Sequence, residues 1–204
     1  MNNFSNFDKL NGDLIRWLKK LFAERMGKDI KLTLRSDLVT VSCIDRSGSI
    51  SITEHNNEFY RVGGEIAYST CSFSEFRSIN AEFENCPCPG RIDTHQDILE
   101  EDVDGYNLNY DVLGLIFWKL SLIEETEINV RDVHQRVCGK QSHAYKHNYL
   151  HLPIIDMWFS ILQTIAKLLW PEYQAPESNF KITPTHDIDR PAKYQFQPKF
   201  RSIK

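Results

Sequence analysis

Two acidic residues near the C-terminus have the residue types and the spacing of a hydrolytic site. Asp187 and Asp189 follow a short β-forming run at 180–183, and α/β folds gather catalytic groups just past the ends of strands. One carboxylate can hold a metal ion while the other takes a proton from the metal-bound water. His186 stands between that strand and the acids as a further candidate metal ligand. A turn with two exposed acids is the alternative.

Three histidines upstream share a helical spacing. His143, His147 and His151 are four residues apart, so they fall on one face if Ser142 caps a helix. Two imidazoles one turn apart can share a zinc ion. Ala144 stands where the catalytic glutamate of an HExxH site belongs. A structural role, buried or hydrogen-bonded, is therefore the favoured interpretation of this pair.

A charged cluster precedes and overlaps these histidines. Glutamates at the C-terminal end of a helix are disfavoured by its dipole, so we expect Glu124 or Glu125 to pair with an arginine. A substrate or partner surface is the alternative. The candidates for this structural or substrate-binding cluster are Glu124, Glu125, Arg131, His134, Arg136, His143, Lys146 and His147.

The elements that must position these residues can be read from hydrophobic periodicity. Apolar residues recur at helical spacing over 7–26, 110–125 and 153–170. Short runs of β-formers separated by turn residues predict strands at 30–34, 38–44, 49–53 and 58–62. Ile50 and Ile52 alternate with serines, which indicates a sheet with one face in water. We expect an α+β fold in which helices pack on a small antiparallel sheet.

Composition limits the function and the compartment. The chain has 204 residues, 24 basic and 28 acidic, with a net charge of −4, which excludes a nucleic-acid polycation and leaves nucleic acid out of the expected partners. No apolar run approaches the ~18 residues of an integral membrane segment, and no secretory signal is visible. Five cysteines, an odd count, then favour free thiols in the cytoplasm. A zinc site at Cys86 and Cys88 is the alternative.

Several of these segments resemble one family. Asp111, Glu124 and Glu125 in 110–125, with 132–136, 142–156 and 184–189, are similar to bacterial polysaccharide deacetylase-like proteins of the NodB-homology type. The similarity covers roughly 109–190, and the first hundred residues share only the general layout. In that family these segments form an uncharacterised N-terminal domain, and the strand at 180–183 opens the deacetylase barrel.

The resemblance also implies roles for the acidic pair. The first motif of these enzymes reads T-F-D-D-G, and Thr185 and Asp187 match it, which makes Asp187 the expected base. The second Asp of the motif binds zinc or a similar ion, but Ile188 stands at that position and Asp189 follows it. The two histidines of the family's next motif should come later, yet no histidine follows Asp189. We therefore expect a divalent metal in the full-length relative and none in this chain alone.

These observations give one main hypothesis and two rivals. Residues 1–178 are predicted to form an N-terminal α+β domain, and 179–204 the first strand and start of a truncated (β/α) deacetylase barrel. This chain is then an accessory module of surface-polysaccharide metabolism, inactive as an isolated chain, whose partners are a polysaccharide or sugar precursor and the missing barrel. One rival is a carbohydrate- or partner-binding scaffold without hydrolase chemistry, which predicts an exposed apolar patch around Trp158 and Trp170. The other is a stand-alone metal hydrolase that brings His143, His147 and Asp187 together.

Overall fold

The computed structural model describes residues 12–35, 38–52, 56–63, 65–73, 83–91, 97–126, 128–177 and 181–185. Asp187, Asp189 and His186 lie outside these ranges, so their predicted roles stay predictions. With η for short 3₁₀ helices, the described elements are α1 (Gly12–Met26), β1 (Ile30–Arg35), β2 (Leu38–Cys43), β3 (Ser49–Ile52), η2 (Asn57–Tyr60), β4 (Tyr68–Cys71), β5 (Cys86–Pro89), β6 (Leu99–Asp102), β7 (Gly105–Leu108), α2 (Val112–Leu120), η5 (Ile123–Glu125), η6 (Gly139–Gln141), α3 (His143–Lys146) and α4 (Ile154–Leu169).

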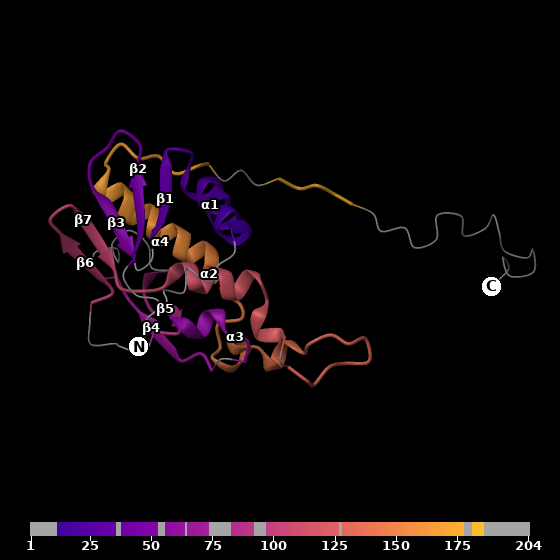
Figure 1. The fold of residues 1–204 in the computed structure, drawn as a ribbon. Coiled ribbons are helices and arrows are strands. Elements are labelled where there is room, and N and C mark those ends of the chain that lie inside the picture. Colours follow the sequence, from indigo (N-terminus) through magenta and orange to yellow (C-terminus); the bar gives the residue numbers. More distant parts are fainter. Residues whose placement is uncertain are drawn as a thin grey trace, which may run out of the picture.

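The larger sheet is mixed, whereas the sequence predicted a purely antiparallel sheet. Its strand order is β1-β2-β3-β7-β6 (Figure 1), and β3 pairs with β7 in parallel while the other neighbours are antiparallel. Alternate residues of β2 (Val39, Val41 and Cys43) are buried, and the residues between them are partly exposed. The α+β class and a sheet with one face in the core are therefore confirmed, whereas the all-antiparallel order is wrong.

The prediction of a fourth strand at 58–62 is also wrong. This segment forms η2, because the side chain of Asn56 accepts a hydrogen bond from the Glu58 backbone N–H at 2.9 Å and starts a helical turn. Phe59 is then fully buried and packs near Trp118 of α2. The chain crosses over through the second sheet, and this crossover makes β3 and β7 parallel.

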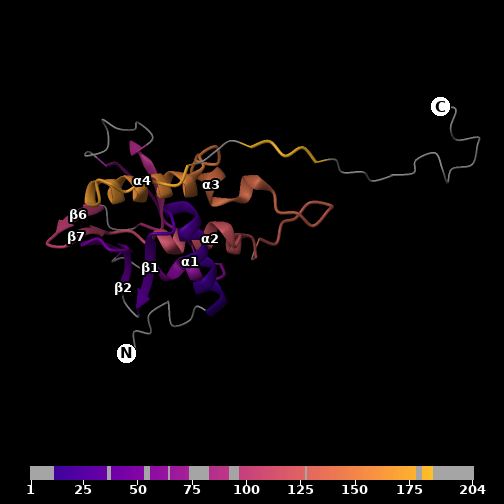
Figure 2. The same cartoon turned by 90° about the horizontal axis from the view of Figure 1, so that it is seen from above.

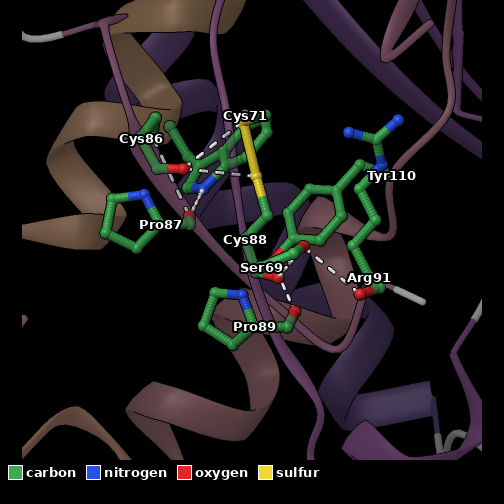
Figure 3. Close-up of a disulfide and its surroundings, with 9 residues drawn as sticks. Ser69, Cys71, Cys86, Pro87, Cys88, Pro89, Arg91 and Tyr110 are labelled. Carbon is green, nitrogen blue, oxygen red and sulfur yellow. Dashed lines mark hydrogen bonds between the residues drawn. A yellow bond between two sulfur atoms is a disulfide. The ribbon is translucent and has the colours of Figure 1, made fainter. Parts of the chain in front are cut away.

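The second sheet pairs β4 with β5, and β5 contains two prolines, Pro87 and Pro89. Proline lacks a backbone N–H, so within a strand it is tolerated where that group faces away from the neighbouring strand. The carbonyl of Pro87 accepts from Trp158 Nε1 at 3.1 Å, and that of Pro89 accepts from the Tyr110 hydroxyl at 2.8 Å. β5 is therefore anchored by its outer edge to the helices while its inner edge pairs with β4 (Figure 3).

A disulfide joins these two strands, where the sequence predicted free thiols. Cys71 of β4 is bonded to Cys88 of β5, with 6.3 Å between their Cα atoms (Figure 3). Cys86 is a buried free thiol on the same strand as Cys88. Burial raises the pKa of this thiol to about 12, which keeps it protonated and unreactive. Free thiols are thus confirmed at Cys43, Cys86 and Cys138 but not at the paired positions.

Helix α4 lies at the centre of the molecule, and its bounds agree with the prediction. It packs against β3 and β7 of the larger sheet, against β5 of the smaller one and against α1 and α2 (Figures 1 and 2). Trp158 is fully buried, and Trp170 is 3% exposed. The prediction of an exposed apolar patch at these two tryptophans, on which a missing barrel would pack, is therefore wrong.

The predicted first barrel strand is not seen either. Residues 181–185 carry no helix or strand and all five are exposed, while residues 178–180 lie outside the described ranges. A strand needs a partner for its backbone groups, and 181–183 make no ladder with any described strand. Among the described residues, no helix is long and apolar enough to cross a bilayer.

A buried carboxylate fixes the start of α2. Asp111, predicted near this position, is 1% exposed, and it caps the helix by accepting from the Gly114 backbone N–H at 2.8 Å. Its other oxygen accepts from the Asn56 backbone N–H at 2.9 Å. The Asn56 amide in turn donates to the Gly90 carbonyl at 2.6 Å. The start of α2, the turn of η2 and the end of β5 are thereby joined.

The close packing at this junction predicts that Gly114→Ala destabilises the protein. A Cβ at position 114 would lie 2.6 Å from a ring carbon of Phe59 and would also crowd the Asp111 carboxylate. We expect a loss of about 1–3 kcal/mol in the free energy of unfolding, as for other overpacked sites. Urea denaturation measures it, and Gly139→Ala is the control because nothing lies within 4 Å there. Equal stability of both variants would contradict the packing described.

Candidate functional site

Four residues of the predicted charged cluster line one pocket. It has a volume of about 230 Å³ and lies between the chain after η2, the end of α2 with η5, and α3. Its buried floor includes Ile66 and Trp118, and its exposed rim includes Arg61, Glu65 and Lys146. The complete lining is Arg61, Gly63, Glu65, Ile66, Trp118, Glu124, Ile128, Gln141, His143, Lys146 and His147.

The histidines of the pocket belong to a helix of a single turn. Ser142 caps α3 as expected, by accepting from the Tyr145 backbone N–H at 3.2 Å. The helix ends at Lys146, and Asn148 then takes a left-handed conformation with φ 58°. His151 is therefore not on the face that His143 and His147 share, and the predicted three-histidine stripe is reduced to a pair.

Both ring nitrogens of His143 are engaged within the protein. Nε2 lies 2.9 Å from the Ile66 carbonyl, and Nδ1 lies 2.7 Å from the Tyr149 hydroxyl. Because a carbonyl only accepts, Nε2 carries the proton and Nδ1 accepts from the tyrosine. Burial, together with the neighbouring His147, lowers the pKa of His143 to about 4, so the ring is neutral near pH 7.

This hydrogen bonding does not fit a zinc site. A zinc ligand needs a nitrogen lone pair directed at the metal, and that of His143 is taken by Tyr149. Within the described ranges, no group of three or more His, Cys, Asp or Glu side chains could hold a metal ion. The hydrogen bonds support the structural role that the sequence favoured for His143. The convergence with Asp187 that the stand-alone hydrolase requires lies outside the described residues.

Stacked aromatic rings position the pair of histidines. The ring of His147 stacks on Tyr68 with centroids 4.5 Å apart, and Tyr68 also stacks on Tyr149 at 5.6 Å. Trp118 and His143 form a T-shaped pair, with their ring centroids 5.3 Å apart. Ring contacts thus connect β4, α2 and α3 beside the pocket.

The acidic end of α2 is neutralised by a lysine and not by the predicted arginines. Lys119 Nζ lies 3.4 Å from Glu124, and their side chains are 15% and 18% exposed. The same ammonium lies 4.0 Å from the centre of the Trp118 ring and 5.5 Å from that of Tyr149. Burial lowers the pKa of Lys119, while Glu124 and Glu125 act against that shift. The pair is therefore a mostly buried support of the pocket wall.

Arg131, His134 and Arg136 of the cluster lie in a separate exposed loop, whereas Glu125 belongs to η5. Asp132 accepts from the backbone N–H groups of His134 and Arg136 at 2.8 and 2.9 Å and pairs with the Arg136 side chain at 2.7 Å. The Arg136 backbone and side-chain bonds lower the pKa of Asp132. Arg131 donates to the backbone carbonyls of Gln135 and Glu125, both at 3.1 Å. The predicted pairing of these arginines with the Glu124 or Glu125 carboxylates is wrong, because the loop satisfies its own charges.

Several polar side chains of the pocket remain free for a ligand. Lys146, Glu65 and the His147 ring nitrogens make no hydrogen bond or ion pair with other described residues. Lys146 supplies a cationic donor, Glu65 an anionic acceptor, and the imidazole of His147 can donate or accept a hydrogen bond. The sequence pointed to Lys146 and His147 but missed Arg61, Glu65 and Trp118. Arg61 was assigned to a strand, and Trp118 was hidden in an apolar helix.

The neutral state of His143 predicts a pH dependence of stability. The pKa of the folded form, about 4, lies below the ordinary value of 6.5, so the unfolded chain binds the extra proton first. The contribution of neutral His143 to the free energy of unfolding is complete above about pH 6.5 and is lost as the pH falls toward 4. We expect the free energy of unfolding of His143→Gln to depend less on pH over this range. His134→Gln, in the exposed loop, is the control, and an unchanged slope in His143→Gln would contradict the assignment.

The mostly buried pair of Lys119 and Glu124 predicts a second effect on stability. Glu124→Gln leaves the Lys119 ammonium mostly buried without its counter-charge, which should cost about 1–3 kcal/mol in the free energy of unfolding. The double variant Lys119→Met, Glu124→Leu should recover much of this loss, since apolar replacement of a buried pair is often neutral. Glu24→Gln, in an exposed pair with Lys20, should cost about 0.5 kcal/mol or less. Equal losses in both glutamate variants would refute the buried support.

Comparison with known proteins gives one match. The model of a family of unknown function, DUF7033, matches residues 15–171. No curated protein and no solved structure matches the chain. The matched region includes every residue of the pocket and all described helices from the first turn of α1 onward. Since the family model covers well over half of the chain, the protein belongs to the DUF7033 family of unknown function.

Proposed function

We propose that this chain is the N-terminal accessory module of a polysaccharide deacetylase-like protein, and that it binds a sugar unit in the pocket beside α3. The observation that carries the proposal is that the pocket gathers Glu124, His143, Lys146 and His147. All four belong to the segments in which the sequence resembles that family. On this proposal the module orients a surface-polysaccharide precursor for hydrolysis elsewhere and releases no acetate itself.

The chemistry of the pocket supports a saccharide ligand. Sugar hydroxyls donate and accept hydrogen bonds, which matches the mixed set of Lys146, Glu65 and His147. The Ile66 and Trp118 floor offers apolar surface for the ring carbons. The volume of about 230 Å³ is below the ~300–1,000 Å³ of drug-sized sites, so it suits one sugar unit better than a large cofactor.

The proposal extends to domain organisation and compartment. Residues 1–178 are the module, and 179–204 begin the barrel, in which Asp187 is the base and Asp189 and His186 are candidate ligands of a divalent metal. The module works in the cytoplasm. In that compartment glutathione and thioredoxin keep most thiols reduced, so Cys71 and Cys88 would spend much of their time as a dithiol.

A nuclear magnetic resonance titration of the full chain tests sugar binding. The probes are a β-1,4-linked tetramer of N-acetylglucosamine and its deacetylated form. One bound unit of about 15 heavy atoms at ~0.3 kcal/mol per atom gives a Kd near 1 mM. We expect the ring signals of His147 to shift with at least one probe, and Lys146→Ala to weaken binding by about tenfold through loss of a charged hydrogen bond.

His151→Ala, outside the pocket lining, is the matched control and should bind as the parent chain does. Absence of any shift at His147 with both probes would overturn the proposed function. So would unchanged affinity in a Lys146→Ala, His147→Ala double variant. Acetate release by the isolated chain would contradict its accessory role.

A further inference from the structure

Three cysteines gather on one face of the small sheet. In the register of the two strands Cys71 lies opposite Cys86, and Ser69 lies opposite Cys88. Side chains alternate along a strand, so the three sulfur-bearing residues share a face, and Cys71 is bonded to Cys88 across it (Figure 3). Tyr68 and Thr70 occupy the opposite face of β4. A single short strand therefore carries the disulfide on one side and, on the other, the Tyr68 ring that stacks on His147.

The site accommodates both the disulfide and the dithiol. The carbonyl oxygen of Cys86 lies 3.5 Å from the sulfur of Cys71 and 3.5 Å from that of Cys88. When the bond is reduced, each new S–H group has this acceptor within reach, so no buried donor is left unsatisfied. The protein interior thus tolerates both states, as a reversible couple requires.

The disulfide joins an anchored strand to one that is held mainly by its neighbour. β5 is fixed to α4 through Trp158 and to the start of α2 through Tyr110. Within the described residues, β4 pairs only with β5. The Cys71–Cys88 bond closes a 17-residue separation and restricts the chain that it closes. Its loss would leave β4 with the ladder, the hydrogen bonds from Ser69 to Cys88 and Arg91, and the ring contacts of Tyr68.

The chain that leads into β4 lines the pocket, and β4 itself supports one of the lining histidines. Ile66, two residues before the strand, lines the pocket floor and accepts from His143 at 2.9 Å. Tyr68, the first residue of the strand, stacks on His147. A change in the mobility of β4 therefore reaches the two histidines directly, through a hydrogen bond and a ring contact.

We propose that the Cys71–Cys88 pair is a thiol-responsive clamp that holds β4 against β5 and so fixes the pocket in its ligand-binding shape. The effect on affinity rests on the proposed function, whereas the clamping of β4 does not. Reduction by a cellular dithiol takes two electrons. A dithiol thiolate attacks the sulfur of Cys71, the less buried of the two residues, and Cys88 leaves as a thiolate that takes up a proton. The second thiol of the dithiol then releases Cys71 as a thiol and becomes a disulfide itself.

The test compares the full chain equilibrated with oxidised glutathione and with excess dithiothreitol. Mass spectrometry of the unreduced digest should show the Cys71–Cys88 link in the first sample and lose it in the second. Amide hydrogen exchange over 65–71 should then be about tenfold faster in the reduced chain, while α4 keeps its protection. Cys88→Ser should exchange like the reduced chain in either buffer, and Cys138→Ser, at an exposed free thiol, should behave as the parent.

Three results would overturn the clamp: no Cys71–Cys88 link in oxidised glutathione, equal exchange of 65–71 in both samples, or equal acceleration throughout α4. If Cys88→Ser does not fold, the oxidised and reduced parent chains still decide the question. Affinity for the sugar probe should fall at least about fivefold on reduction, about 1 kcal/mol, and an unchanged affinity would also refute the proposal. If neither form binds sugar, the proposed function fails, and the exchange data alone decide the clamp.

Discussion

The buried carboxylate of Asp111 is the interaction on which the arrangement of this protein depends. A charge in the interior is tolerated only when it is hydrogen-bonded, and Asp111 is satisfied by the backbone N–H groups of Gly114 and Asn56. One bond starts α2, and the other holds the turn that enters η2. Burial and this carboxylate together raise the pKa of Tyr60, which shows how closely η2 is packed on the charge. Asn56 then carries the connection to Gly90, where φ is +83° and a Cβ would lie 2.6 Å from the Asn56 amide.

The pocket is a consequence of this junction. One wall, with Arg61 and Glu65, follows η2, and another, with Glu124, is η5, which follows the helix that Asp111 starts. The third wall is α3, attached to the first by the hydrogen bond from His143 to Ile66. Charges in the walls are largely neutralised locally, as in the Lys119–Glu124 and Arg61–Glu58 pairs. The polar groups left for a ligand are therefore few and specifically placed.

The parts of this structure that a single sequence predicts are those with strong local signals. The period of 3.6 residues locates α1 and α4, the alternation in 38–44 and 49–53 locates β2 and β3, and Asp111 and Ser142 are recognisable caps. Failures occur where distant contacts override local preference. The prolines of β5 are acceptable because Trp158 and Tyr110 use their carbonyls, and η2 forms because Asp111, 55 residues away, holds Asn56. Likewise, Lys146 and His147 could be selected from the sequence, but Arg61 and Glu65 reach the pocket only through the crossover after β3.

The most direct measurement of the central claim is a crystal structure of the full chain with the N-acetylglucosamine tetramer. The account predicts one sugar unit between α3 and the chain after η2, with Lys146 and Glu65 within ~3.2 Å of its polar atoms and its ring carbons over Ile66. His143 should keep its bonds to Ile66 and Tyr149. A sugar bound elsewhere with this pocket empty, or a pocket closed by its own side chains in the presence of saturating tetramer, would contradict the account.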